Sequence, residues 1–209
     1  MRADALRNRS AILEAAECAY AEHGLDVSLN EIARRAGIGN ATLYRHFGSH
    51  DALIAEVYAQ HLERYCAIAE EAAAADDPTR ALRDCITATC ALQAANRGLA
   101  ELLASLRPVS PHVESLRARH YVAITTVIER AVRSGGVRED LQPADVAILL
   151  MANTGLIQRT ADDAPGSSAR LVSVWLAGVL SPTVLNDPPA PTEHEISQAL
   201  RRVGRAGGV

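Results

Sequence analysis

The chain has 209 residues, 48% of them hydrophobic, which is enough for one large domain or for a small domain joined to a larger one. Only 3% are aromatic, so the core must be built from aliphatic side chains. No apolar run approaches the ~20 residues of a membrane span, and no hydrophobic region of a secretory signal follows the start. We therefore expect a cytoplasmic protein whose 4 cysteines are reduced thiols.

The formal net charge of −4 argues mildly against a nucleic-acid-binding protein, but the charges are unevenly placed. All 21 basic residues are arginine, and acidic residues of the N-terminal region, Glu14, Glu17 and Glu22, lie along its first expected helix. A region that is neutral overall can still present one basic face. The charge therefore leaves DNA binding open, with modest non-specific affinity.

The first expected helix spans residues 10–23, where apolar side chains recur on one stripe, and Gly24 ends it. Ser28 can cap the next helix, and Glu31 three residues later can return the hydrogen bond as a capping box. Gly37 ends this second helix, because glycine readily takes the left-handed conformation that a helix stop often needs.

Residues 40–47 form a further short helix, in which Leu43 and Phe47 are spaced i, i+4 and face inward. Two short helices joined by a glycine turn indicate a helix-turn-helix. The side chains left without a core to bury in are those of Asn40, Ala41, Thr42, Tyr44, Arg45 and His46. Such a polar outer face suits the DNA major groove, although a short amphipathic helix pair inside an ordinary α-domain gives a similar pattern.

The N-terminal quarter resembles the DNA-binding domain of the TetR family of bacterial transcriptional repressors. The runs that carry the resemblance are Ile12-Leu13-Glu14-Ala15-Ala16, Glu31-Ile32-Ala33, Ala36-Gly37-Ile38, Thr42-Leu43-Tyr44, His46-Phe47 and Ala52-Leu53. The rest of the chain matches only in length and helical character. The resemblance implies an all-α fold, with a three-helix helix-turn-helix domain at residues 1–50, a helical ligand-binding and dimerisation domain at 51–185, and a Pro/Gly-rich tail at 186–209.

Three residues depart from the family pattern. Gly39 stands where a Ser or Thr usually caps the recognition helix, and glycine offers no side-chain acceptor. Ala41 occupies a position that is often glycine or proline, and its methyl group can contact thymine. His50 replaces the usual lysine at a phosphate contact, which should make that contact weaker or pH-dependent.

The DNA contacts follow from chemistry and from the resemblance together. Thr42, Tyr44 and His46 are expected to bind phosphates and set the position on the duplex. Asn40 and Arg45 are the candidates for reading bases. The full expected set adds Ser28, Ala41, His50 and the N-terminal arm residues Arg2, Arg7 and Arg9, although the arm could equally be a disordered solubilising tail.

Helical patterns continue to residue 180, with breaks at Asp76-Asp77-Pro78, Gly98, 107–111 and Gly135-Gly136. Residues 143–160 and 168–180 are the most apolar, and a helix that is hydrophobic all round needs a partner on each side. We therefore expect a homodimer built on this pair, the alternative being a central buried helix in a monomer. Beyond Pro182 the chain reads mostly as a tail, and Thr192 to Glu195 could cap one last short helix.

Three polar residues fall on otherwise apolar helix stripes: His61, His120 and Asn153. Burying a polar group without a partner costs roughly 1–3 kcal/mol, so another side chain, a water or a ligand must satisfy each one. Together they predict a ligand cavity with a shared polar spot, lined mainly by aliphatic groups. Each could instead be a satisfied core residue.

Enzyme motifs are missing: no phosphate-binding glycine loop, no Gly-x-Ser-x-Gly and no His-Glu-x-x-His. No cofactor is expected, and His46 with His50 makes a poor metal site without a third ligand. The sequence thus predicts a ligand-responsive regulator, most simply a repressor that binds a palindromic operator as a dimer and is released by a small molecule. The alternatives are a helical ligand-binding protein without operator binding and, less simply, an all-α enzyme.

Overall fold

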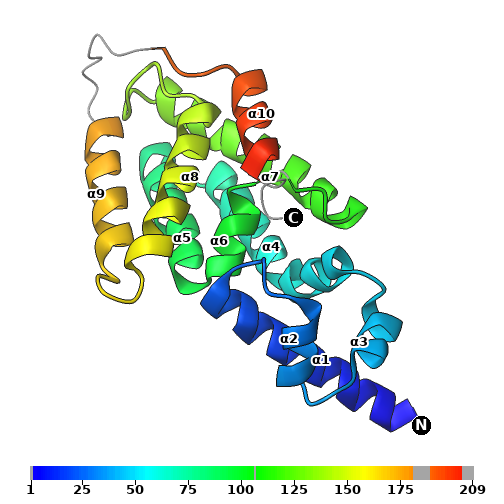
Figure 1. Ribbon diagram of the computed structural model, residues 1–209. Helices are drawn as coiled ribbons and strands as arrows, with labels where there is room; N and C mark the ends of the chain where they lie inside the picture. Colours follow the sequence, from blue (N-terminus) through cyan, green and yellow to red (C-terminus); the bar gives the residue numbers. More distant parts are fainter. Residues whose placement is uncertain (1, 106, 181–188, 204–209) are drawn as a thin grey trace.

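The computed structural model describes residues 2–105, 107–180 and 189–203, and these contain ten helices and no strand (Figure 1). The predicted all-α fold is confirmed. The helices are α1 (Arg2–His23), α2 (Leu29–Arg35), α3 (Asn40–Phe47), α4 (His50–Ala74), α5 (Pro78–Ala95), α6 (Arg97–Leu103), α7 (Pro111–Arg133), α8 (Pro143–Thr160), α9 (Ser167–Val179) and α10 (Glu193–Val203). The first three form a small lobe at one end, and α4 leads from it into the larger bundle.

Most helices begin where a capping side chain satisfies a free backbone amide. The side chains of Ser49, Asp77, Asn96 and Ser110 each accept a hydrogen bond from the amide three residues later, at the starts of α4, α5, α6 and α7. Proline occupies the first turn of α5, α7 and α8, where no amide partner is needed. Helices α3, α8 and α9 begin and end within one residue of the boundaries expected from the sequence.

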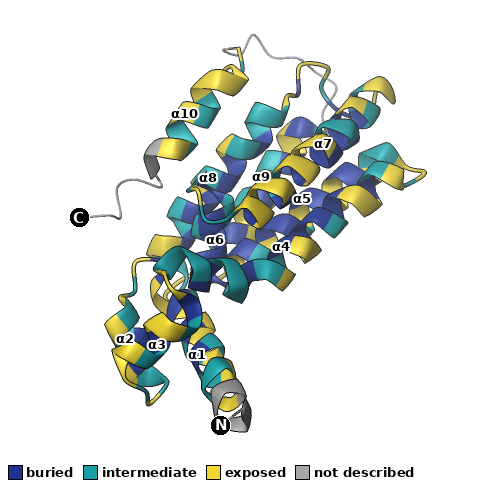
Figure 2. Ribbon diagram, turned by 90° about the vertical axis from the view of Figure 1, so that its right-hand side faces the viewer, coloured by how far each residue is buried: buried dark blue, intermediate teal, exposed yellow. Residues whose placement is uncertain are grey.

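Two hydrophobic clusters share the interior, which Figure 2 shows as the dark-blue faces of the helices. One cluster joins α1, α2 and α3 to the first half of α4, to α6 and to the start of α7. The other joins the second half of α4 to α5, α7, α8 and α9. Because α4 contributes to both clusters, the small lobe and the bundle are connected by a packed helix and not by a free linker.

Helix α6 adds a second connection between the lobe and the bundle. Gly98 lies so close to α1 and α4 that an added Cβ would come within 2.3 Å of the Tyr58 hydroxyl and 2.9 Å of Tyr20 Cβ. One turn later, the Glu101 carboxylate accepts the Leu25 amide at 2.7 Å and the Gln158 side chain at 3.0 Å. Glu101 therefore links the α1–α2 turn to α8.

Arg97 makes a parallel bridge at the start of α6. Its guanidinium donates to the backbone carbonyl of Glu22, at the end of α1, at 3.1 Å. The same group pairs with Asp162, just beyond α8, at 2.8 Å. Two side chains of one short helix thus tie the small lobe to the same end of α8.

The two ends of the chain are more helical than the sequence indicated. Helix α1 starts at Arg2, not near Ser10, since residues 2–9 contain no glycine or proline. The side chains before Arg7 lie outside the described part, so the expectation for Arg2 falls there. At the other end Thr192 caps α10, an 11-residue helix that packs against α8. Among the described residues, no helix is both long and apolar enough to cross a bilayer.

Candidate nucleic-acid interface and ligand cavity

The helix-turn-helix is built by local hydrogen bonds. The Ser28 hydroxyl accepts the Glu31 amide at 3.2 Å and starts α2, as the sequence predicted. Gly37, with a φ of 68°, turns the chain between α2 and α3. Gly39 is the N-cap of α3 and provides no side-chain hydrogen bond. Helix α3 therefore starts without the side-chain cap that serine or threonine would provide.

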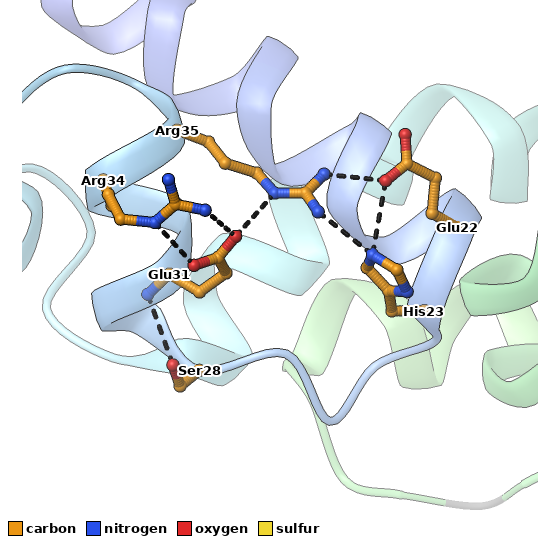
Figure 3. A network of polar contacts seen from close by, with 6 residues as sticks. All are labelled: Glu22, His23, Ser28, Glu31, Arg34 and Arg35. Atoms are coloured by element: carbon orange, nitrogen blue, oxygen red, sulfur yellow. Dashed lines mark hydrogen bonds and ion pairs between the residues drawn. The ribbon is translucent and has the colours of Figure 1, made fainter.

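An ion-pair network holds α2 against α1 (Figure 3). The Glu31 carboxylate accepts Arg34 and Arg35, so it does not return the second half of the expected capping box. Arg35 reaches across to Glu22 at 2.8 Å and to the ring of His23 at 3.0 Å. Hydrogen bonds from the two guanidinium groups lower the pKa of Glu31 to about 2. The network connects α2 with the end of α1, and Arg34 stays exposed beside it.

Helix α3 is clearly two-sided. Leu43 and Phe47 are buried, whereas Ala41 and Arg45 are exposed and Tyr44 is 52% exposed. No other described residue forms a side-chain hydrogen bond or ion pair with Tyr44 or Arg45, so both are available to an outside partner.

The remaining polar residues of α3 lie at the edges of this exposed face. The Asn40 amide donates to the Asn30 side chain at 2.5 Å, which ties the start of α3 to α2. Thr42 and His46 are half-buried. The outward surface of α3 thus carries an amide, a hydroxyl, a phenol, a guanidinium and an imidazole, while Leu43 and Phe47 pack its other face into the core.

Arg9 and His50 differ from their expected roles. Arg9, on α1, pairs with the Glu56 carboxylate of α4. Its guanidinium also lies over the Phe47 ring of α3, 5.1 Å from the ring centre, so Arg9 contacts both helices. The His50 ring is half-buried, with its centre 5.7 Å from that of Tyr20, and its Nε2 atom is sealed without a partner among the described residues. Burial lowers the pKa of His50. Neither side chain is arranged as a free phosphate contact.

The bundle contains a cavity of about 720 Å³ between α4, α7, α8 and α10, a size typical of small-molecule sites. Its walls are mainly aliphatic: Leu62, Leu103, Leu116, Ile124, Val146, Ala147, Leu150, Ile196 and Leu200. The last two come from α10, which covers one side. Sequence reasoning missed this contribution, although the i, i+4 spacing of Ile196 and Leu200 behind the Thr192 cap is the signal that could have revealed it.

The rings of Tyr65 and His120 stack in the cavity wall, with their centres 3.7 Å apart at an angle of 15°, and the buried Ser105 also lines the cavity. Tyr65 and His120 are both buried, at 7% and 8% exposed. Neither has a hydrogen-bond partner among the described residues. Burial lowers the pKa of His120 to about 3, so its imidazole is neutral at physiological pH. The role of Tyr65 was not foreseen, because its pairing with α7 depends on tertiary packing.

His61 and Asn153 lie elsewhere. His61 is half-buried and pairs with Glu17 at 3.0 Å, beside a smaller groove of about 450 Å³ between α1, α4, α5 and α6. Asn153 is fully buried and donates to the Gln93 side chain at 2.9 Å between α8 and α5. The structure therefore does not bring the three polar residues together. Of the three, only His120 lines the large cavity, and Asn153 lies in the core, where its Nδ2 is bonded to Gln93 and its Oδ1 has no partner among the described residues.

Of the four free cysteines, Cys18 is exposed and the other three are buried. Cys66, Cys85 and Cys90 are buried free thiols, and burial raises their pKa values to about 11, 11 and 12. Within the described ranges, no group of three or more His, Cys, Asp or Glu side chains could hold a metal ion.

Comparisons with known sequences match both parts of the chain. Residues 12–57 match the family model of bacterial regulatory proteins of the tetR family. Residues 77–181 match that of the C-terminal domain of SbtR-like transcriptional regulators. An HTH-type transcriptional regulator of Staphylococcus aureus (strain bovine RF122) is 50% identical over 48 residues, which are 22% of this chain and 26% of the relative. The chain therefore matches only about a quarter of the length of such curated relatives.

Solved structures resemble the chain over most of its length. The TetR family regulator PfmR from Thermus thermophilus is 26% identical with a TM-score of 0.56, covering 80% of this chain and 97% of that one. The TetR regulator SCO0520 from Streptomyces coelicolor is 31% identical with a TM-score of 0.53, covering 84% and 99%. The likeness thus extends well beyond the helix-turn-helix.

Proposed function

The chain belongs to the tetR family of bacterial regulatory proteins, and from this premise we propose that it is a ligand-responsive transcriptional repressor and not an enzyme. In this proposal a homodimer binds a palindromic operator, with one α3 helix in the major groove of each half-site. A small molecule that enters the bundle releases the operator.

The observation that carries the proposal is the outer face of α3. Its phenol and guanidinium have no partners among the described residues, while Leu43 and Phe47 anchor the opposite face in the core. A short, firmly supported helix that presents polar groups to solvent matches the requirements of base reading in the major groove.

Each side chain has a role in the proposed complex. Arg45 and Asn40 read base edges, and Ala41 contacts a thymine methyl group. Thr42, Tyr44 and His46 bind phosphates together with the Ser28 hydroxyl, which keeps its proton free to donate. Arg9 and His50 are assigned to the packing of the lobe, and the exposed Arg34 of α2 is paired with Glu31.

The cavity of about 720 Å³ is the proposed effector site. Leu62 and Tyr65 of α4 line it, and the same helix starts at His50, directly after α3. A ligand that moves α4 can therefore alter the distance between the two α3 helices of a dimer. It releases DNA only when it prefers the arrangement that does not fit the operator.

Selection of bound sequences from a random DNA pool tests the proposal most directly. We expect a palindrome whose half-sites are separated by about one turn of DNA or somewhat more. A gel shift with that sequence should show a complex that Arg45→Ala weakens. If no sequence is enriched while the cavity still binds small molecules, the chain is a helical ligand-binding protein without an operator.

A further inference from the structure

The charged groups of the effector cavity are already paired or lie at its rim. Arg117 is the only cavity-lining arginine among the described residues, and its side chain donates to the carbonyls of Arg107 at 2.7 Å and Leu102 at 3.3 Å. Its charge is matched by Glu114, at 2.6 Å. The remaining acid on the wall, Glu193, is exposed on α10. Arg117 therefore holds the α6–α7 connection, and an anionic ligand would have to compete with Glu114 for it.

The wall of the cavity is mainly aliphatic and carries three buried neutral polar side chains, those of Tyr65, Ser105 and His120. Tyr65 and His120 are more than nine-tenths buried, line the cavity and have no hydrogen-bond partner among the described residues. A neutral imidazole offers one donor and one acceptor, and a phenol can do either. Buried groups of this kind are normally satisfied, so the cavity is prepared for a ligand that carries the missing partner.

The walls also restrict the shape of that ligand. Apart from Tyr65, the only aromatic side chain among the described lining residues is Tyr121, which is 44% exposed at the rim. One face of the Tyr65 ring is covered by His120 at 3.7 Å, so little aromatic surface is left for stacking a planar molecule. The leucine, isoleucine and valine side chains of the walls suit an aliphatic chain instead.

We propose that the cavity binds an uncharged, mainly aliphatic molecule with a single hydroxyl or carbonyl oxygen, which Tyr65 and His120 recognise. This ligand class can be tested without DNA, because binding to the cavity is measured on the protein alone. Only the release of the operator on binding rests on the proposed function.

The test uses three probes of equal chain length: n-octanol, octanoate and n-octylamine. Calorimetric titration of the full chain at neutral pH should show n-octanol binding at least about tenfold more tightly than either charged probe, because Arg117 is already paired with Glu114 and the Glu193 carboxylate lies exposed at the rim. Tighter binding of n-octylamine would assign the site to cations held by Glu193. Tighter binding of octanoate would assign the site to anions held by Arg117. Failure of n-octanol to bind would overturn the proposal.

Conservative variants then test the two recognising residues. Tyr65→Phe and His120→Phe keep the stacked rings and should each weaken n-octanol binding by about tenfold. Tyr44→Phe removes a phenol on the outer face of α3, outside the cavity, and is the matched control, with no change in n-octanol binding expected. Circular dichroism shows whether each variant folds. Wild-type affinity in both folded core variants would refute the assignment.

A gel shift separates this proposal from the proposed function. If n-octanol binds as described but leaves the operator complex intact, the ligand class stands and the release mechanism fails. If the operator complex forms and no uncharged probe binds, the regulator stands and the ligand class fails.

Discussion

At the scale of single residues, Arg45 has the sharpest expected effect. Arg45→Ala should weaken operator binding by about 1–3 kcal/mol and relax specificity at one base pair, since its guanidinium has no partner within the described protein. Arg34→Ala is the control, because it removes an exposed arginine of α2 whose guanidinium is already paired with Glu31. Quantitative gel shifts on operator variants should show Arg34→Ala weakening all sequences alike; the same uniform loss for Arg45→Ala would exclude base reading by this side chain.

His120 should make stability depend on pH. Its pKa falls from 6.5 to about 3 in the folded protein, so the folded state stays neutral where the unfolded chain binds a proton. The stabilisation is complete above pH 6.5 and is lost progressively down to about pH 3, at roughly 1.4 kcal/mol per pH unit. Urea unfolding at fixed protein concentration gives the measurement.

His120→Phe provides the reference for that experiment, because it keeps the stack on Tyr65 and cannot titrate. Between pH 6.5 and about pH 5 the wild type should lose about 2 kcal/mol more of its free energy of unfolding than the variant does. Equal losses in the two proteins would mean that His120 is protonated in the fold, or that it is not buried in solution.

At the scale of helices, α6 depends on a glycine for its close approach to the small lobe. Gly98→Ala would place a methyl group 2.3 Å from the Tyr58 hydroxyl and should lower the free energy of unfolding by about 1–3 kcal/mol. Gly166→Ala, at the N-cap of α9, where the backbone is in the αR region, has no neighbouring group within 4 Å of the added methyl group and should change stability much less. Thermal unfolding compares the two, and equal stability of the two variants would mean that α6 is not packed as described.

The helices themselves could be predicted from the sequence, because caps and breakers are local signals. Ser28 caps α2 as expected, and the predicted break at Asp76-Asp77-Pro78 separates α4 from α5. What could not be predicted is which polar side chains meet across helices. The pairing of Arg9 with Glu56 and the stacking of His120 on Tyr65 depend on how distant segments pack, and periodicity within one helix carries no information about that.

At the scale of the whole molecule, the expected dimer can be tested on its outer face. Leu149, buried at 2% exposed, belongs to the core of the protomer, whereas Ile148 and Val174 are 38% and 54% exposed on α8 and α9. Val174→Glu should therefore shift a dimer toward monomers without loss of helix, because a buried unpaired charge is costly at an interface.

Val122 on α7 offers the control for that variant, since it is 66% exposed on another helix. Val122→Glu should leave the mass unchanged in light scattering at micromolar concentration. A monomeric wild type would refute the proposed interface, as would dimers of equal stability in both variants.

The contacts between α6 and the small lobe limit where this chain could be cut to make chimaeric proteins with its relatives. Suppose that residues 1–50 alone were transplanted onto the bundle of a relative. Tyr20 would then lose its close neighbour Gly98, and the Leu25 amide would lose its acceptor Glu101. The transplanted lobe would then expose apolar surface and an unsatisfied amide. A chimaera that senses a new compound should therefore keep α6 with the lobe, or use a recipient that carries a glycine and a carboxylate one helical turn apart at the same place.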